Sequence, residues 1–193
     1  MITFHTLFGD RLNLNGDQAN LFVLQRRLAW QGIDSQVAAI DSVNDLHNID
    51  VNSGFLLIGH GSQAAMRTIE PLASEIRDSV FELAAAGLTG LAVGSGYELL
   101  YPDFERGSRL SDYADIPASD ELPEIFGYIN SDTNLPAVSV LGESFVCTTV
   151  HGPVLARSPQ LADHLLSQLG IKVIETADAV EADGYALGAR AHN

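Results

Sequence analysis

The sequence predicts a doubly wound α/β fold with a mainly parallel central sheet and a short antiparallel addition. Through the first half of the chain, segments rich in β-forming residues alternate with segments of helical periodicity. Two continuous apolar runs, residues 54–59 and 90–93, are bounded by glycine, as is typical of strands that helices cover on both faces. The chain has 193 residues, the size of one domain, so we expect residues 1–193 to form a single domain.

The N-terminal segment predicts a strand, a helix and a second strand. Residues 2–8 and 35–40 are rich in β-forming side chains. Between them, residues 18–31 carry leucine at helical spacing, with Asp17 as the expected N-cap and Gly32 as the expected stop. This order is typical of the start of a doubly wound sheet.

The middle of the chain continues the alternation. A helical pattern covers residues 63–85, and we expect Pro71 to kink or divide it, because proline lacks the backbone N–H that a helix interior needs. Residues 102–124 are polar, acidic and interrupted by prolines, which indicates an excursion over the surface and not a linker between domains. Three short strands of the antiparallel addition are expected next, at residues 125–130, 137–141 and 145–150.

The C-terminal part predicts helical structure around one further strand. Ser158 and Pro159 have the character of a capping serine followed by proline at the first helical position, and Gly170 would end that helix. Residues 172–175 are expected to form a last edge strand, and the alanine-rich tail from Thr176 to form a helix.

Charge and composition narrow the classes of partner. Ten basic and 25 acidic residues give a net charge of −15, which would repel a nucleic-acid backbone or an anionic membrane surface. No segment has the roughly 18 consecutive apolar residues of a membrane helix, and the first ten residues lack the pattern of a signal peptide. Cys147 is the only cysteine, which excludes an intrachain disulfide. We therefore expect a cytoplasmic protein with no nucleic-acid partner, no membrane insertion and no metal or organic cofactor.

Candidate site residues follow the predicted strands, where ligands bind in open α/β sheets. Three glycine-containing segments end strands: residues 59–63, 94–96 and 148–153. Glycine permits close backbone approach and exposes amide groups that could hold an oxyanion, and His151 could act as a base. The alternative is that each glycine only permits a tight turn.

Several motifs, in order over residues 5–170, resemble one enzyme family. They are LFGDRLNLNGDQANLFVLQRRLAWQGI, FLLIGHGSQ, LAVGSGYELL, FGYIN and VHGPVLARSPQLADHLL. Together they resemble the cobyric-acid-synthase-like class I glutamine amidotransferases, most closely the small amidotransferase subunit of lipid II isoglutaminyl synthase. The resemblance implies a flavodoxin-like sheet of the class I amidotransferase type. It also implies a Mur-ligase-like synthetase subunit as partner.

The departures from the family pattern concern the catalytic residues. The family uses a cysteine at a strand-to-helix elbow to attack the side-chain amide of glutamine, with a histidine that carries the proton. The position that matches the cysteine is Gly94 here, whereas the histidine is retained as His151. Asn15 replaces a tyrosine and Glu98 replaces a glutamine near the substrate. The implied substrate and oxyanion pocket comprises Gly59, His60, Gly61, Gly96, Glu98 and Asn130, with His60 at a glycine position of the family.

We therefore expect an amidotransferase-like protein without glutaminase activity, a non-catalytic subunit in amidation for cell-wall or cobalamin-type biosynthesis. Two alternatives stay open. The first is an active amide hydrolase or amidotransferase with a relocated nucleophile, Ser95 with His151, although Ser95 could simply cap the short helix. The second is a module that binds an unidentified small molecule. Cys147 is expected to be a small buried hydrophobe, and a metal site of His60, His151 and Glu98 lacks a supporting ligand spacing.

Overall fold

The computed structural model describes residues 1–190, and a six-stranded sheet with the order β2-β1-β3-β4-β8-β7 lies at its centre. Neighbouring strands from β2 to β8 run parallel, and β7 is antiparallel to β8. This sheet confirms the predicted doubly wound, mainly parallel fold. The strands are β1 (Ile2–Leu7), β2 (Ser35–Ile40), β3 (Gly54–Ile58), β4 (Thr89–Val93), β7 (Val138–Leu141) and β8 (Phe145–Thr148).

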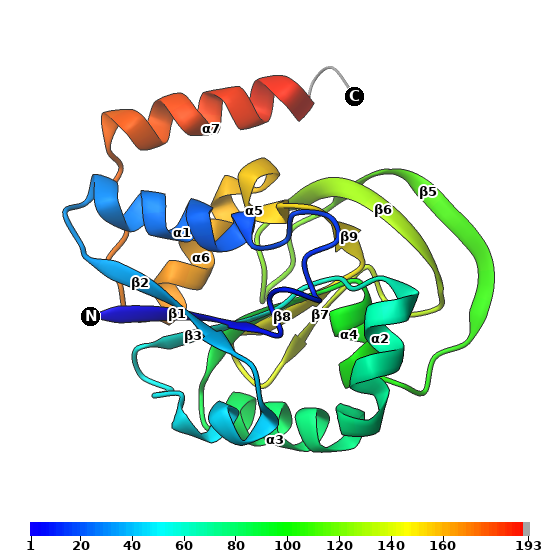
Figure 1. Ribbon diagram of the computed structural model, residues 1–193. Helices are drawn as coiled ribbons and strands as arrows, with labels where there is room; N and C mark the ends of the chain where they lie inside the picture. Colours follow the sequence, from blue (N-terminus) through cyan, green and yellow to red (C-terminus); the bar gives the residue numbers. More distant parts are fainter. Residues whose placement is uncertain (191–193) are drawn as a thin grey trace.

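Helices cover both faces of the sheet (Figure 1). One face carries α1 (Ala19–Trp30), α5 (Val154–Arg157) and α6 (Pro159–Gln168), with α7 (Ala177–Arg190) stacked outside α1. The other face carries η1 (Val43–Asn48), α2 (Gln63–Ile69), η2 (Glu70–Leu72), α3 (Ala73–Ala85) and α4 (Ser95–Leu100). Each face therefore buries its own apolar cluster. No helix in residues 1–190 is long and apolar enough to cross a membrane.

Local sequence signals account for much of this layout. The leucines at helical spacing in α1 are buried in the core beneath the helix, as predicted. Gly32 and Gly170 follow helix ends with positive φ angles of 72° and 74°. The expected break at Pro71 is confirmed, because a single 3₁₀ turn separates α2 from α3.

A second, antiparallel sheet contains β5 (Arg106–Ile116), β6 (Ile125–Thr133) and β9 (Val150–His151). β5 and β6 form a long curved ribbon that arches away from the central sheet (Figure 1). Residues 102–124 do run over the surface, as predicted, but the expectation of a solvated loop was wrong for residues 106–116, which form β5. β5 is exposed along most of its length and is held by backbone pairing with β6, so it has none of the apolar alternation that marks a half-buried strand.

Two further strand predictions need correction. Residues 145–148 do not belong to an antiparallel addition, because β8 pairs in parallel with β4 inside the central sheet and is fully buried. Residues 172–175 form no strand; there, the backbone N–H of Ile174 donates to the side-chain oxygen of Gln31 at 3.0 Å.

The two predicted side-chain caps were also wrong. The carboxylate of Asp17 does not cap α1 but accepts the backbone N–H of His60 at 3.1 Å. Ser158 precedes α6, yet its hydroxyl accepts the N–H of Phe126 at 2.9 Å and donates to the same residue's carbonyl at 3.1 Å. In both cases a tertiary contact has replaced the local hydrogen bond that the sequence favours.

Candidate functional site

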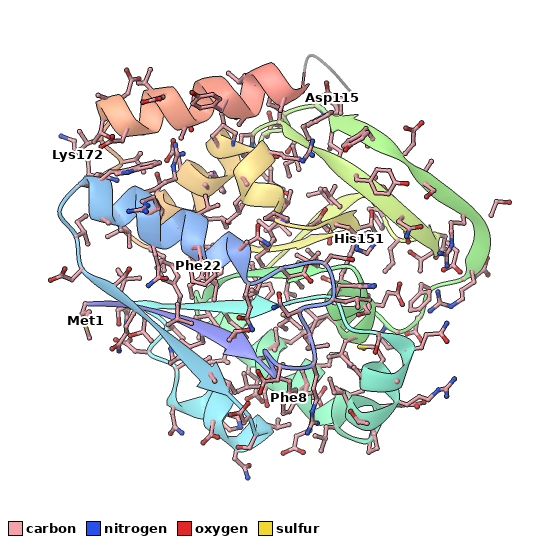
Figure 2. All side chains as sticks on the ribbon, turned by 45° about the horizontal axis from the view of Figure 1, so that its top comes forward. Met1, Phe8, Phe22, Asp115, His151 and Lys172 are labelled. Atoms are coloured by element: carbon pink, nitrogen blue, oxygen red, sulfur yellow. The ribbon has the colours of Figure 1, made fainter. Side chains whose placement is uncertain are left out.

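The glycine-containing turns predicted to end strands meet at one edge of the central sheet. β4 ends at Val93, Gly94 follows with φ 55° and ψ −116°, and α4 begins at Ser95. A positive φ of this kind strains any residue other than glycine. The strand-to-helix elbow is therefore present in the fold, with glycine at its apex. Figure 2 shows His151 in the region between the central sheet and the β5–β6 ribbon.

Two imidazole rings occupy the space where a side chain of residue 94 would lie. A Cβ atom built on Gly94 would be 2.5 Å from Nδ1 of His60 and 2.7 Å from Cε1 of His151. The two rings are packed edge to face, with centroids 4.6 Å apart and an interplanar angle of 86°. The elbow thus has no nucleophile and no room for one while both rings keep their positions.

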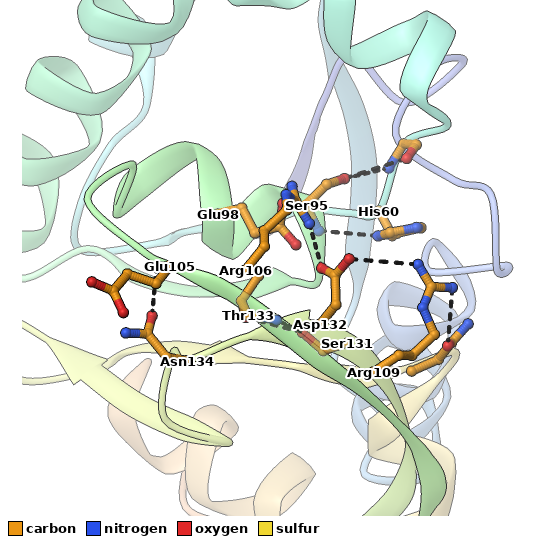
Figure 3. Close-up of polar contacts among 12 residues, drawn as sticks. His60, Ser95, Glu98, Glu105, Arg106, Arg109, Ser131, Asp132, Thr133 and Asn134 are labelled. Carbon is orange, nitrogen blue, oxygen red and sulfur yellow. Dashed lines mark hydrogen bonds and ion pairs between the residues drawn. The ribbon is translucent and has the colours of Figure 1, made fainter.

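The backbone amides around the elbow are paired internally. The N–H of Ser95 donates to Nδ1 of His60 at 3.0 Å (Figure 3). The N–H of Gly61 donates to the hydroxyl of Ser95 at 2.8 Å, and this hydroxyl lies 3.4 Å from the carbonyl oxygen of Gly61. Neither amide is therefore free to stabilise an oxyanion, which requires N–H groups directed at the reacting atom.

Ser95 has a structural role in this arrangement. It is buried, forms the first residue of α4 and does not cap the helix, since the N-cap residue is Gly94. Among the described residues its hydroxyl bonds to Gly61 and not to His151. A serine that is to attack a substrate needs a base in contact with its hydroxyl, so this geometry does not favour the alternative of a hydrolase that uses Ser95 and His151.

Hydrogen bonds define the protonation of both histidines. Nε2 of His151 must donate to the carbonyl oxygen of Asn130, 3.0 Å away, so Nδ1 accepts from the side-chain amide of Asn15 at 3.0 Å. Burial lowers the pKa of His151, and the positive charge of Arg109 lowers it further. Burial and the neighbouring His151 lower the pKa of His60 to about 4. Both rings are therefore neutral at pH 7, and Nε2 of His60 carries that ring's proton.

Glu98 belongs to a charged network beside the elbow (Figure 3). Its carboxylate lies 3.0 Å from the guanidinium of Arg106, which also pairs with Asp132. Arg109 lies 3.8 Å from Asp132 and donates to the side-chain oxygen of Asn130 at 3.4 Å. Sequence reasoning missed both arginines because the segment around them was interpreted as a solvated loop. The pairing of β5 with β6 brings them beside Asp132 and Asn130, where both line the cleft at the elbow.

The other glycines of the expected pocket have different surroundings. Cβ atoms on Gly59 and Gly96 would collide with backbone carbonyl oxygens of Leu12 and Ile58, respectively. These two glycines permit close packing of neighbouring turns and do not line the cleft. The expected pocket residues that do line it are His60, Gly61, Glu98 and Asn130, together with Gly94, Ser95 and His151.

The cleft itself has a volume of about 840 Å³. It extends from the elbow between α2 and the β5–β6 ribbon, so side chains from widely separated parts of the sequence line it. A cavity of this size suits a small molecule.

The remaining candidate chemistry lies outside this cleft or does not assemble. Cys147 is buried on β8, where desolvation raises the pKa of its thiol to about 12, as suits a small hydrophobe. Within residues 1–190, no cluster of three or more His, Cys, Asp or Glu side chains could hold a metal ion. Glu98 is turned to Arg106 and does not join His60 and His151.

The sequence matches no protein-family model and no curated protein. Comparison with solved structures gives a glutamine amidotransferase from Thermotoga maritima, with a TM-score of 0.51, 14% identity and coverage of 97% of this chain and 94% of that one. Drosophila melanogaster DJ-1beta matches with a TM-score of 0.43, 10% identity and coverage of 96% and 97%. The first likeness agrees with the expected class I amidotransferase type of fold, and shows that this chain has the α/β fold of a glutamine amidotransferase.

Proposed function

We propose that this chain is an amidotransferase-like protein that does not hydrolyse glutamine. Release of ammonia from glutamine by the family's route needs a thiolate, a histidine and amides open to the oxyanion. The resemblance of the sequence motifs places Gly94 where that thiolate would be. The histidine alone remains, as His151, and a base without a nucleophile completes no acyl transfer.

One observation carries the proposal: the ring of His60 fills the position of the missing side chain. Its Nδ1 lies 2.5 Å from where a Cβ of residue 94 would be, and it also accepts the N–H of Ser95. The His60 ring therefore occupies the space that a nucleophile would need, and it also binds an amide that could otherwise hold an oxyanion. Restoring a cysteine would restore neither, because the ring would remain in place.

The test is ammonia release from glutamine by the native protein and a set of variants. We expect no turnover by the native protein and little or none by Gly94→Cys. Gly94→Cys/His60→Gly should recover more activity, because it supplies the thiol, space for it and a free amide. Adding Glu98→Gln should help further, since it removes a carboxylate beside the cleft.

His151→Ala in the most active variant is the matched control and should abolish the recovered turnover. Appreciable hydrolysis by the native protein that His151→Ala abolishes would mean that a nucleophile lies elsewhere, and the proposal would fail.

We further propose that the chain acts as a non-catalytic subunit of a Mur-ligase-like synthetase, in amidation for cell-wall or cobalamin-type biosynthesis. This rests on the N-terminal and histidine motifs, which keep their resemblance to the family although the elbow has changed. Affinity purification from the native cell should recover such a synthetase in a stoichiometric complex. Recovery of the chain as a monomer with no partner would contradict this role.

A further inference from the structure

The cleft beside the elbow has a charge balance opposite to that of the chain. The whole sequence has 25 acidic and ten basic residues. In the part of the chain that the structure describes, four of the ten basic residues line this cavity, namely Arg67, Arg77, Arg106 and Arg109. Only three acidic residues line it, namely Glu70, Glu98 and Asp132. Cations are thus concentrated at one hollow of a strongly acidic protein, which focuses attraction for anions there.

The arginines differ in how firmly they are neutralised. Arg106 pairs with both Glu98 and Asp132, so two carboxylates already compensate its charge. Arg109 is 61% exposed, and its nearest carboxylate is that of Asp132 at 3.8 Å. Arg67 is exposed on α2 and makes no ion pair with any described residue. Arg67 and Arg109 therefore keep guanidinium N–H groups available to a ligand, from opposite elements of the cleft.

The floor of the cleft adds a further donor. Nδ1 of His60 accepts the N–H of Ser95, so Nε2 carries the proton, and His60 lines the cavity. His151 contributes no free nitrogen, because Asn15 and Asn130 engage both of them. The unengaged polar groups near the elbow are thus mainly donors, which calls for a ligand rich in acceptor oxygens.

We propose that this cleft binds a small molecule through an oxyanion, a carboxylate or phosphate group, held between Arg109 of the ribbon and Arg67 of α2. Planar guanidinium groups bind both kinds of oxyanion with paired hydrogen bonds. Arg106 is a positioning residue, since its two ion pairs tie the ribbon to α4. The inference rests on the proposed function, because a cleft without a nucleophile holds its ligand and does not convert it.

Isothermal titration calorimetry of the native chain tests this with two matched pairs of probes. Glutarate is compared with its neutral diamide, glutaramide, and glycerol phosphate is compared with glycerol. We expect at least one anion to bind and its neutral counterpart not to bind, with affinity that falls as salt is raised. The anion that binds identifies the group as carboxylate or phosphate.

Arg109→Gln and Arg67→Gln should each raise the dissociation constant by about tenfold or more, the effect of losing one charge-assisted contact. Arg26→Gln is the matched control: Arg26 is exposed on α1 outside the cleft, so this change alters the net charge equally and should leave binding unchanged.

Three results would overturn the inference: no binding of either anion, equal binding of the neutral probes, or equal weakening by Arg26→Gln. The glutaminase assay separates this from the proposed function. Ammonia release by the native protein would overturn the proposed function and leave the anion measurement standing, whereas absent anion binding would overturn only the inference.

Discussion

The packing of His60 against Gly94 predicts that substitutions at these two positions are energetically coupled. Gly94→Ala adds one methyl group at a point 2.5 Å from the His60 ring and 2.7 Å from the His151 ring. His60→Gly removes the first of these rings. The added methyl group should therefore cost less free energy of folding when His60→Gly is already present.

The magnitude follows from two separate costs. A residue other than glycine at φ 55° and ψ −116° costs about 1–3 kcal/mol of backbone strain, which His60→Gly does not relieve. Insertion of a methyl group into filled space costs about 1–3 kcal/mol more. Gly94→Ala alone should thus destabilise the fold by about 2–6 kcal/mol. Its contact with His151 would persist in the double variant, so we expect a coupling energy of about 1–2 kcal/mol.

Urea denaturation of the native protein, both single variants and the double variant completes the cycle. Gly32→Ala is the control for the backbone cost, because Gly32 has φ 72° with no atom within 4 Å of its Cβ position. Gly32→Ala and His60→Gly should be additive. Additivity of Gly94→Ala and His60→Gly to within about 0.5 kcal/mol would refute the packing argument.

Three further outcomes are expected. Ser95→Ala should lower the free energy of unfolding by about 1–3 kcal/mol in urea, because it leaves the buried N–H of Gly61 without its acceptor. The pKa of His60 is about 4 in the folded chain and 6.5 in the unfolded chain. Between pH 4 and 6.5, His60 is therefore protonated in the unfolded chain but mostly neutral in the folded chain. The stability of the native protein relative to His60→Asn should therefore fall by about 2–3 kcal/mol from pH 6.5 to 4, and a constant difference would contradict it. Asp17, whose pKa burial raises to about 6, contributes in the opposite direction but equally to both proteins. Cys147 should react with a thiol reagent only after denaturation, and rapid labelling of the native protein would show that the thiol is not buried.

The sequence predicted the elements whose signals are local. β3 and β4 contain the apolar runs that begin at Gly54 and Gly90, and both strands are buried throughout. The leucine spacing of α1, the break at Pro71 and the stop at Gly32 depend only on near neighbours in the sequence. The convergence of the glycine turns was also predictable, because the carboxyl ends of parallel strands lie at one edge of a sheet.

The elements that were mispredicted depend on partners distant in the sequence. β5 carries almost no buried side chain, and its strand conformation exists because β6 offers a backbone to pair with. β8 begins with three apolar residues, yet its parallel pairing with β4 could not be predicted because the ribbon lies between the two strands in the sequence. Asp17 is a residue type that often caps helices, but its carboxylate instead accepts the N–H of His60 in the turn after β3.

The charged side of the cleft could not be found from the sequence for the same reason. Arg106 and Arg109 lie three residues apart on β5. The acidic residues and prolines around them are typical of a solvated loop, so the sequence did not predict a strand there. Both arginines approach Asp132 through the pairing of β5 with β6, and Arg106 also reaches Glu98 on α4. Arg67, on α2, lines the same cleft from the opposite side, and no local signal in the sequence places α2 beside the ribbon.

The shape of the elbow does not depend on a nucleophile. Gly96 lies against the carbonyl groups at the end of β3, and the hydroxyl of Ser95 is bonded to the backbone of Gly61, so the two turns fix one another. Within that fixed frame, the ring of His60 fits only where residue 94 has no Cβ, and the N–H of Ser95 needs the ring as its acceptor. Glycine at 94 and histidine at 60 therefore fit each other as a pair, because one imidazole fills the space beside Gly94 and accepts the N–H of Ser95. Under the proposed function, this pairing predicts that recovery of glutaminase activity requires both positions to change together.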